Sequence, residues 1–288
     1  MTAARGYNPI DMDTLSLGYS PCPNDTFIFY AMVHGKIDTG GLGFREVLED
    51  VETLNLMAGR EELDITKVSF AAFAGLRDKY ALLRSGGALG RGCGPLLVAR
   101  EKAGISSLRG KKIAIPGHNT TAFMLLRLLD PALGQNATAM PFNEIMPAVR
   151  DGRVDAGLII HESRFTYPAF GLCELMDLGE WWEQETDHPI PLGCIIARRS
   201  LGAELAMRVE GLVRKSIELS FARPREPVDY IKAHSQEMED DVIRKHIDLY
   251  VNDYSLDLGD DGVAAVDALF RMAEERGLIK SQGKPLFF

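Results

Sequence analysis

The chain has 288 residues, of which 46% are hydrophobic and 25% are charged. These values are typical of a globular protein, and the length allows one large or two medium domains. The formal net charge of −9, with no run of lysines and arginines among aromatic residues, argues against a nucleic-acid partner.

The N-terminal segment and the cysteines bear on the cellular compartment. Residues 1–9 contain no apolar segment of the ~7–15 residues that a secretory signal needs. No apolar stretch approaches the ~20 residues of a membrane span. Four scattered cysteines form no C-x-x-C pair, which is typical of a reduced protein. We therefore expect a cytoplasmic protein with no membrane partner.

The first part of the chain alternates between strand and helix patterns. Residues 1–13 are polar and predict an irregular tail. Strands are expected at 15–19, 42–48 and 63–66, and helices at 27–33, 51–58 and 69–77. Asn24 or Asp25 can cap the first helix after two prolines that end the strand. This alternation predicts a mainly parallel sheet.

A second block with the same alternation follows a glycine-rich segment at 85–94. Its expected strands are 95–100, 112–116, 137–140, 156–160 and 191–198, and its expected helices are 119–129 and 144–150. Beyond residue 201 the pattern is helical. The helices expected there are 201–222, 227–233, 240–251 and 262–276.

Two strands with similar sequences bracket this second block. Residues 94–100 and 193–198 both run from glycine through apolar residues to Ala-Arg. This pairing predicts two crossings between domains, with a ligand cleft between them. The expected fold is α/β with a discontinuous first domain, 14–97 and 196–288, and a second domain, 98–195.

Four loop-to-helix positions offer ligand-binding groups. They are residues 20–26, 66–69, 119–121 and 161–164. The unpaired N–H groups and the dipole of a helix start favour an anion there, and a small carboxylate would suit them. Plain helix capping is the commoner reason for residues such as Asn24, Ser69 and Asn119 at these places. Convergence of the four segments on one cleft would favour ligand binding.

His161 follows an apolar run at 157–160, where a strand is expected to end. Ligands of α/β proteins sit at the carboxyl ends of strands, so this is a suitable place for a general base. A hydrogen-bonded rim histidine is the alternative. Zinc-protease spacing, a phosphate loop and a nucleophile elbow are all absent from the sequence. We therefore expect no metal, and either cofactor-free acid–base chemistry or simple binding.

Long motifs resemble the 1,4-dihydroxy-6-naphthoate synthases of the futalosine route to menaquinone. These motifs are 20–27, 66–69, 84–90, 119–121 and 161–168. The likeness is collinear from Leu15 to the C-terminal Pro-Leu-Phe-Phe. It implies a fold like that of periplasmic binding proteins. It also implies a lyase that converts cyclic dehypoxanthine futalosine to 1,4-dihydroxy-6-naphthoate and releases dihydroxyacetone.

The resemblance also implies roles for particular residues. His161 corresponds to the proton acceptor of the family, and the substrate contacts correspond to Lys67, Val68, Ser69, Thr120 and Thr121. The loops add the candidate substrate-binding residues Ser20, Asn24, Ser163 and Arg164. We hypothesise that Ser163 or Glu162 orients the imidazole and that the helix start at Thr120 holds the substrate carboxylate.

Two other functions fit the same sequence patterns. A solute-binding protein for a small carboxylate would have the same two-domain architecture, although such proteins are normally exported. Chorismate dehydratase, a sister enzyme of the same pathway, has a similar fold. The sequence leaves the oligomeric state open.

Overall fold

The computed structural model describes residues 14–236, 239–281 and 283–288 of the chain. The tail expected over residues 1–13 lies outside these described residues. The strands are β1 (Thr14–Tyr19), β2 (Gly43–Leu48), β3 (Ile65–Ser69), β4 (Tyr80–Leu82), β5 (Ala88–Gly90), β6 (Leu96–Ala99), β7 (Ile113–Ile115), β8 (Ala137–Ala139), β9 (Ala156–Ile159), β10 (Cys173–Asp177) and β11 (Ile190–Arg198).

The helices cluster around two sheets. The α-helices are α1 (Pro23–Val33), α2 (Val51–Gly59), α3 (Phe70–Ala74), α4 (Thr121–Leu129), α5 (Phe142–Arg150), α6 (Ser163–Thr166), α7 (Leu178–Thr186), α8 (Ala203–Ala222), α9 (Val228–His234), α10 (Asp240–Tyr250), α11 (Asp253–Leu256) and α12 (Gly259–Glu275). Short 3-10 helices are η1 (Ile105–Leu108), η2 (Pro131–Gly134), η3 (Tyr167–Phe170) and η4 (Arg199–Leu201).

The first sheet has the order β2-β1-β3-β11-β4, and β5 also pairs with β11. β1 runs parallel to β2 and β3, whereas β11 is antiparallel to β3, β4 and β5. Every residue of β3 is buried, as expected for a strand covered on both faces. The parallel part agrees with the alternating sequence pattern, and the returning β11 makes the sheet mixed.

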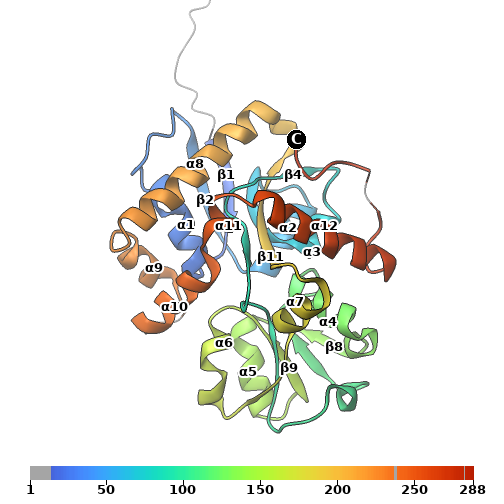
Figure 1. The fold of residues 1–288 in the computed structure, drawn as a ribbon. Coiled ribbons are helices and arrows are strands. Elements are labelled where there is room, and N and C mark those ends of the chain that lie inside the picture. Colours follow the sequence, from blue (N-terminus) through green and yellow to red (C-terminus); the bar gives the residue numbers. More distant parts are fainter. Residues whose placement is uncertain (1–13, 237–238, 282) are drawn as a thin grey trace, which may run out of the picture.

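The second sheet forms the lower lobe in Figure 1, with the order β10-β6-β9-β7-β8. β7 pairs in parallel with β8 and β9, while β6 is antiparallel to β9 and β10. The apolar β9 is buried throughout. It runs through the middle of this sheet and ends next to His161, so the sheet fixes where that residue stands.

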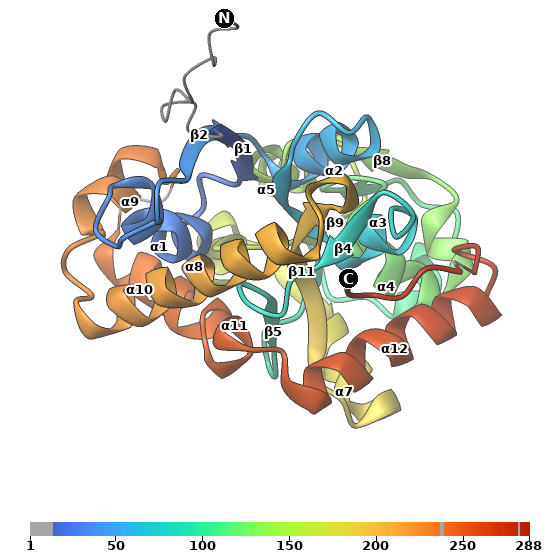
Figure 2. The same cartoon turned by 90° about the horizontal axis from the view of Figure 1, so that it is seen from above.

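Helices cover the upper sheet on both sides. α1 packs against α8, α9 and α10, while α2 packs on β3 and α12 contacts both β11 and α4. Seen from above, α1, α9 and α10 lie at one end of the molecule and α4 lies at the other (Figure 2). No helix within the described ranges has the length and apolar character needed to cross a bilayer.

Two segments connect the lobes. The first lies between β5 and β6, at residues 91–95, and the second lies between β10 and β11, at residues 178–189 and including α7. β6 pairs along its length with strands of the lower sheet, and β11 pairs with strands of the upper sheet. The crossings therefore precede the expected boundaries at 97/98 and 195/196, which would cut through both strands. We propose 91–95 and 178–189 as the boundary segments.

Three expected caps differ in the structure. α1 begins at Pro23, so Cys22 holds the N-cap position and Asn24 and Asp25 lie inside the first turn. A proline needs no N–H partner at the first helical position, which lets the helix start early. Thr120 rather than Asn119 caps α4, through a hydrogen bond from the Phe123 amide.

Several short elements were not expected from the sequence. β4 and β5 have three residues each, which is too short for a periodic pattern to appear. β10 and α7 occupy a stretch for which the sequence predicted no helix or strand, and Trp182 of α7 is fully buried there.

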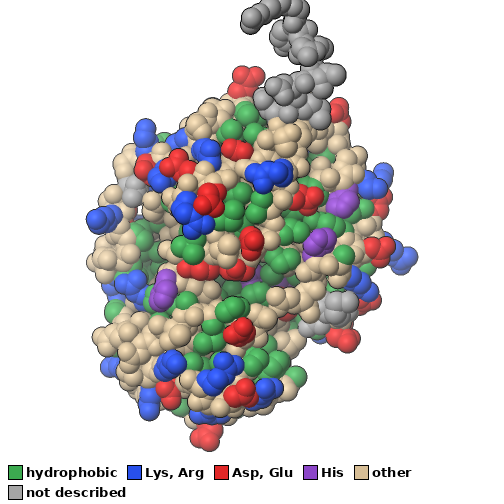
Figure 3. Space-filling model, turned by 180° about the vertical axis from the view of Figure 1, so that it is seen from behind, with side chains coloured by type: hydrophobic (Ala, Val, Ile, Leu, Met, Phe, Trp, Pro, Cys, Tyr) green, Lys and Arg blue, Asp and Glu red, His purple; other side chains and the backbone are tan. Residues whose placement is uncertain are grey.

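Figure 3 shows Lys and Arg side chains interspersed with Asp and Glu on one face of the molecule.

Candidate active site

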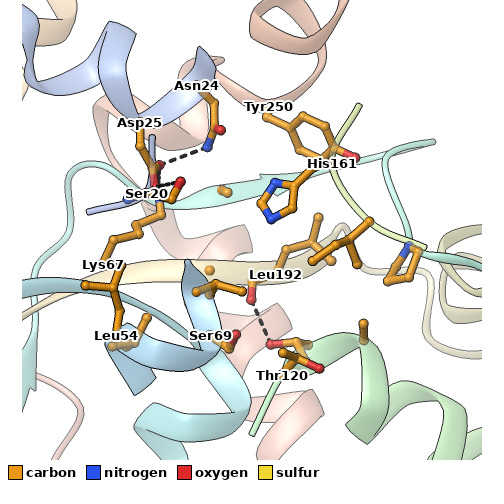
Figure 4. A pocket seen from close by; sticks show the side chains of 18 of the residues that line it. Ser20, Asn24, Asp25, Leu54, Lys67, Ser69, Thr120, His161, Leu192 and Tyr250 are labelled. Carbon is orange, nitrogen blue, oxygen red and sulfur yellow. Dashed lines mark hydrogen bonds and ion pairs between the residues drawn. The ribbon is translucent and has the colours of Figure 1, made fainter. Parts of the chain in front are cut away.

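A cleft of about 700 Å³, including space open to solvent, lies between the two lobes. It is bordered by the ends of β1, β3 and β9 and by the start of α4 (Figure 4). Because the carboxyl ends of these strands face the same space, polar side chains from distant segments meet there. The lining residues are Ser20, Asn24, Asp25, Val51, Leu54, Lys67, Val68, Ser69, Ala88, Cys93, Pro95, Thr120, Thr121, Ala122, Ile160, His161, Leu192, Gly193 and Tyr250.

Most candidate residues from the sequence meet in this cleft. Those that line it are Ser20, Asn24, Lys67, Val68, Ser69, Thr120, Thr121 and His161. Ser163 and Arg164 are not among the lining residues. The sequence proposed that four loop-to-helix segments meet at one cleft. Residues from three of these segments line the cleft, and His161 is the residue of the fourth segment that does so.

His161 lies two residues beyond the end of β9 and has a backbone φ of 57°. Few non-glycine residues adopt this left-handed region, where the backbone costs roughly 1–3 kcal/mol. Its ring is tilted against that of Phe142, with the centroids 5.1 Å apart. Burial lowers the pKa of His161 to about 4, with Lys67 lowering it further and Asp25 opposing the shift. The imidazole is therefore neutral at pH 7 and has a free lone pair.

Asp25 organises the wall opposite His161 (Figure 4). Its carboxylate accepts hydrogen bonds from the amide and hydroxyl of Ser20, at 3.2 and 2.8 Å, and from Nδ2 of Asn24 at 2.9 Å. Nζ of Lys67 lies 3.1 Å from Asp25 Oδ1 and donates to the Gly86 carbonyl at 2.8 Å. All these polar side chains are buried. The sequence had suggested only capping for Asp25.

The start of α4 faces the cleft from the lower lobe. The Thr120 hydroxyl donates to the Gly117 carbonyl at 2.8 Å, and the Thr121 hydroxyl donates to the Leu192 carbonyl at 2.7 Å. The Thr121 hydroxyl also accepts the Ala71 amide at 3.2 Å. Both hydroxyls thus fix the helix end, and Thr121 ties it to the upper lobe. The first N–H groups of the helix remain the groups suited to an anion.

Ser69 ends β3 and precedes α3. Its amide donates to Asn55 Oδ1 at 2.9 Å, and its hydroxyl accepts from Asn55 Nδ2 at 3.3 Å. The hydroxyl makes no capping bond to α3, so its hydrogen can be offered to a ligand. Val68, the preceding residue, is fully buried and adds an apolar surface.

Asn119 lies outside the cleft and contacts the upper lobe. Its amide and side-chain Nδ2 both donate to Oε1 of Glu52, at 3.1 and 2.8 Å. Its expected role as a helix cap is therefore wrong, because Glu52 of α2 engages its side chain instead.

Arg164 contacts the crossings rather than the cleft. Arg164 donates to the Gly94 carbonyl at 2.7 Å and to Asp177 Oδ2 at 2.6 Å. Asp177 caps α7 by accepting the Gly179 and Glu180 amides. Arg164 therefore joins the two connecting segments, and the buried Ser163 begins α6 below the cleft.

Two residues of α10 reach the site without having been singled out in the sequence. Tyr250 lines the cleft. His246 is fully buried, and its ring is stacked on that of His161. They are four positions apart on one face of the helix, and this spacing on an otherwise apolar stripe is the signal that could have marked them. The spacing could not show that this face of α10 borders the cleft and His161 of the lower lobe.

One group of side chains has the donor types of a metal site. Single donor atoms of Cys22, His161 and Glu162 lie within 4.8 Å of one another. Burial, with a contribution from Glu162, raises the pKa of the Cys22 thiol well above its usual range. A metal ligand must be the thiolate, so binding of a metal by Cys22 would require loss of the thiol proton.

These features define a two-lobed α/β protein with a cleft between its lobes, which His161 lines. The family model for menaquinone biosynthesis matches residues 15–275. The chain belongs to this menaquinone biosynthesis family.

Two curated relatives support the same family. The 1,4-dihydroxy-6-naphtoate synthase of Thermus thermophilus is 51% identical over 276 residues, covering 96% of this chain and 100% of that protein. The 1,4-dihydroxy-6-naphtoate synthase of Streptomyces coelicolor is 48% identical over 276 residues, covering 94% and 96%. These relatives favour a biosynthetic enzyme over the solute-binding alternative.

Solved structures confirm the expected fold. A protein from Archaeoglobus fulgidus has a TM-score of 0.87 and 39% identity, covering 92% of this chain and 98% of that one. A Candida albicans protein described as having the generic periplasmic binding protein fold has a TM-score of 0.68 and 14% identity, covering 93% and 92%. The periplasmic-binding-protein-like architecture predicted from the sequence is therefore correct.

Proposed function

We propose that this chain converts cyclic dehypoxanthine futalosine to 1,4-dihydroxy-6-naphthoate and releases dihydroxyacetone, with His161 as the general base and no cofactor. The names of its relatives support the reaction. The observation that carries the mechanism is the neutral imidazole of His161 at the end of β9, facing the cleft.

Removal of one acidic proton can start this reaction. The electron pair left on the substrate drives cleavage of a carbon–carbon bond, and formation of an aromatic ring makes the step favourable. A positioned base contributes roughly 10²–10⁴-fold to such a step. The base becomes an imidazolium when it takes the proton, and the nearby Asp25 carboxylate, which raises the pKa of His161, favours that charge.

The substrate carboxylate is assigned to the opposite side of the cleft. The start of α4 presents N–H groups next to Thr120 and Thr121, which suits an anion. Two acceptors, Asp25 and the Gly86 carbonyl, occupy two of the three N–H bonds of Lys67, and the third can reach a ligand. Ser69 offers a hydroxyl from the end of β3, and Val68 an apolar surface.

We also propose that the protein acts in the cytoplasm. Its four cysteines are free, and Cys22, Cys93 and Cys194 are buried, which suits a reducing compartment. Fractionation of cells that produce the protein tests this location. Recovery from an extracytoplasmic fraction would contradict it and would favour a solute-binding role.

The test of function is turnover with purified protein. Incubation with cyclic dehypoxanthine futalosine should give a naphthoate chromophore and dihydroxyacetone, while incubation with chorismate should leave chorismate unchanged. His161→Ala should lower kcat by about 100-fold or more while its circular dichroism spectrum stays native. His188→Ala is the matched control, since the described contacts of His188 are outside the cleft.

Each result has a defined consequence. Turnover of chorismate alone would replace the proposal with a dehydratase. Ligand binding without turnover of either compound would favour the solute-binding alternative. Naphthoate formation with a fully active His161→Ala enzyme would keep the reaction and reject His161 as its base.

A further inference from the structure

His246 is a buried histidine that faces His161 and has no role in the proposed mechanism. It lies on α10 in the upper lobe and has no exposed surface. Its ring is nearly parallel to that of His161, at an interplanar angle of 7° and a centroid distance of 6.0 Å. The upper lobe therefore supplies a flat surface facing the imidazole that the lower lobe presents.

Hydrogen bonds determine which nitrogen of His246 carries the proton. Asn24 donates through Nδ2 to Asp25 Oδ1 at 2.9 Å, so its Oδ1 is the acceptor that faces away from Asp25. That Oδ1 lies 2.9 Å from Nε2 of His246. Since a carbonyl oxygen can only accept, Nε2 of His246 must be the donor.

The opposite nitrogen, Nδ1, points toward the residue that follows the base. It is buried, makes no hydrogen bond to any described residue, and lies 3.6 Å from Oε2 of Glu162. Glu162 is adjacent in sequence to His161. Through these two contacts α10 borders both the imidazole of His161 and the carboxylate of the residue that follows it.

We propose that His246 is a positioning residue for His161: its ring, fixed as the neutral Nε2–H tautomer by Asn24, holds the plane of the catalytic imidazole. This inference rests on the proposed function, because it assumes that His161 is the base. Asn24 and Asp25 thereby gain a role in orientation in addition to lining the cleft.

Neutrality of His246 matters for the base. An imidazolium beside His161 would oppose the second positive charge that forms when His161 takes a proton. Burial and the neighbouring His161 both lower the pKa of His246 well below its usual value. The groups facing His246 are Glu162 and His161 from the lower lobe, Asn24 from α1 and Tyr250 from its own helix.

Nitrogen NMR of ¹⁵N-histidine-labelled wild-type protein tests the assigned tautomer. At pH 7 the His246 resonances should be those of a neutral ring protonated on Nε2. The signal can be assigned by replacing the other five histidines one at a time. An Nδ1–H tautomer or a charged ring would overturn the inference, and this measurement does not depend on any activity.

Kinetics test the effect on the base. His246→Gln keeps an N–H donor for Asn24 but removes the ring, so kcat should fall on the order of 10- to 100-fold with KM within about twofold of wild type. A purely structural role would lower stability without this split. His234→Gln on α9 is the control, because that ring contacts Tyr230 away from the cleft.

The two proposals fail in different ways. If His161→Ala is inactive and folded His246→Gln has wild-type kcat, the positioning role alone is wrong. If His161→Ala retains full activity, the base assignment is wrong whatever His246 does. If His246→Gln does not fold, two other measurements test the positioning role. One is the kcat of His246→Phe, which keeps a ring at the stacking position, and the other is the tautomer of His246 in the wild-type protein.

Discussion

Lys67 and Asp25 form an ion pair inside the cleft, with 3.1 Å between Nζ and Oδ1 and 6% and 3% of their side chains exposed. Charges so far from water are stable only when each has its partner. The pair joins β3 to α1 and forms part of the cleft lining.

Removing one member of this pair should be strongly destabilising. Asp25→Ala leaves the Lys67 ammonium buried without its counter-charge, and we expect a loss of about 3–5 kcal/mol in the free energy of unfolding. Urea unfolding at pH 7 measures it. Glu62→Ala, which breaks the exposed Arg60–Glu62 pair, should change the same quantity far less, because solvent screens that pair. Equal losses for both variants would show that the buried pair contributes no more to stability than the exposed pair.

The sequence predicted the elements with a clear period and missed those without one. β1, β3 and β9 are apolar runs bounded by turn residues, and their positions were expected to within a few residues. β4 and β5 are too short to be recognised. β6 and β11 look alike in sequence but belong to different sheets, which is why the crossings that we propose differ from the expected boundaries.

The site was predicted where one motif carries both position and chemistry. Ser69 ends β3, while Thr120 and His161 lie in the segments that follow β7 and β9, so local pattern places them at the cleft. His246 could not be found this way, because its contact with Asn24 joins positions 222 residues apart. Arg164 has the charge expected of a carboxylate ligand, but local sequence could not show that Asp177 and the Gly94 carbonyl engage it.

The lowered pKa of His161 predicts a pH dependence of stability. Its pKa is about 4 in the folded protein, below the ordinary value of 6.5, so the unfolded chain binds more protons between these two pH values. Stability should therefore fall as pH decreases from 6.5 to 4 and level off below that range. The contribution of this group is up to about 3 kcal/mol. His161→Asn should flatten the curve of unfolding free energy against pH.

That comparison isolates one histidine. His246 is present in both proteins, and burial, the main cause of its lowered pKa, acts on it in both, so most of its contribution is common to the two curves. Urea unfolding at several pH values from 7 to 4 gives both curves. Parallel curves for wild type and His161→Asn would mean that burial does not depress the pKa of His161.

Gly94 should tolerate no side chain. A Cβ atom there would lie 2.2 Å from the Gly179 amide nitrogen and 2.3 Å from its Cα, and backbone cannot rotate away as a side chain can. We expect Gly94→Ala to lose about 1–3 kcal/mol or more of unfolding free energy. Gly104→Ala, where nothing lies within 4 Å of the added carbon, should be neutral within about 0.5 kcal/mol. Thermal unfolding of both variants compares them.

Arg164 should affect stability rather than substrate affinity. Its guanidinium binds the Gly94 carbonyl and Asp177, at the two connecting segments, and it does not line the cleft. Arg164→Gln removes this link and leaves the half-buried Asp177 carboxylate with fewer donors. We expect a loss of about 1–3 kcal/mol and a KM within about twofold of wild type. Urea unfolding and steady-state kinetics on one preparation measure both quantities. Arg150→Gln, at an exposed pair with Asp151, is the control.

A KM raised tenfold or more with stability unchanged would instead make Arg164 a substrate ligand, as the sequence had led us to expect. That result would require the lower lobe to move so that the Arg164 side chain reaches the cleft.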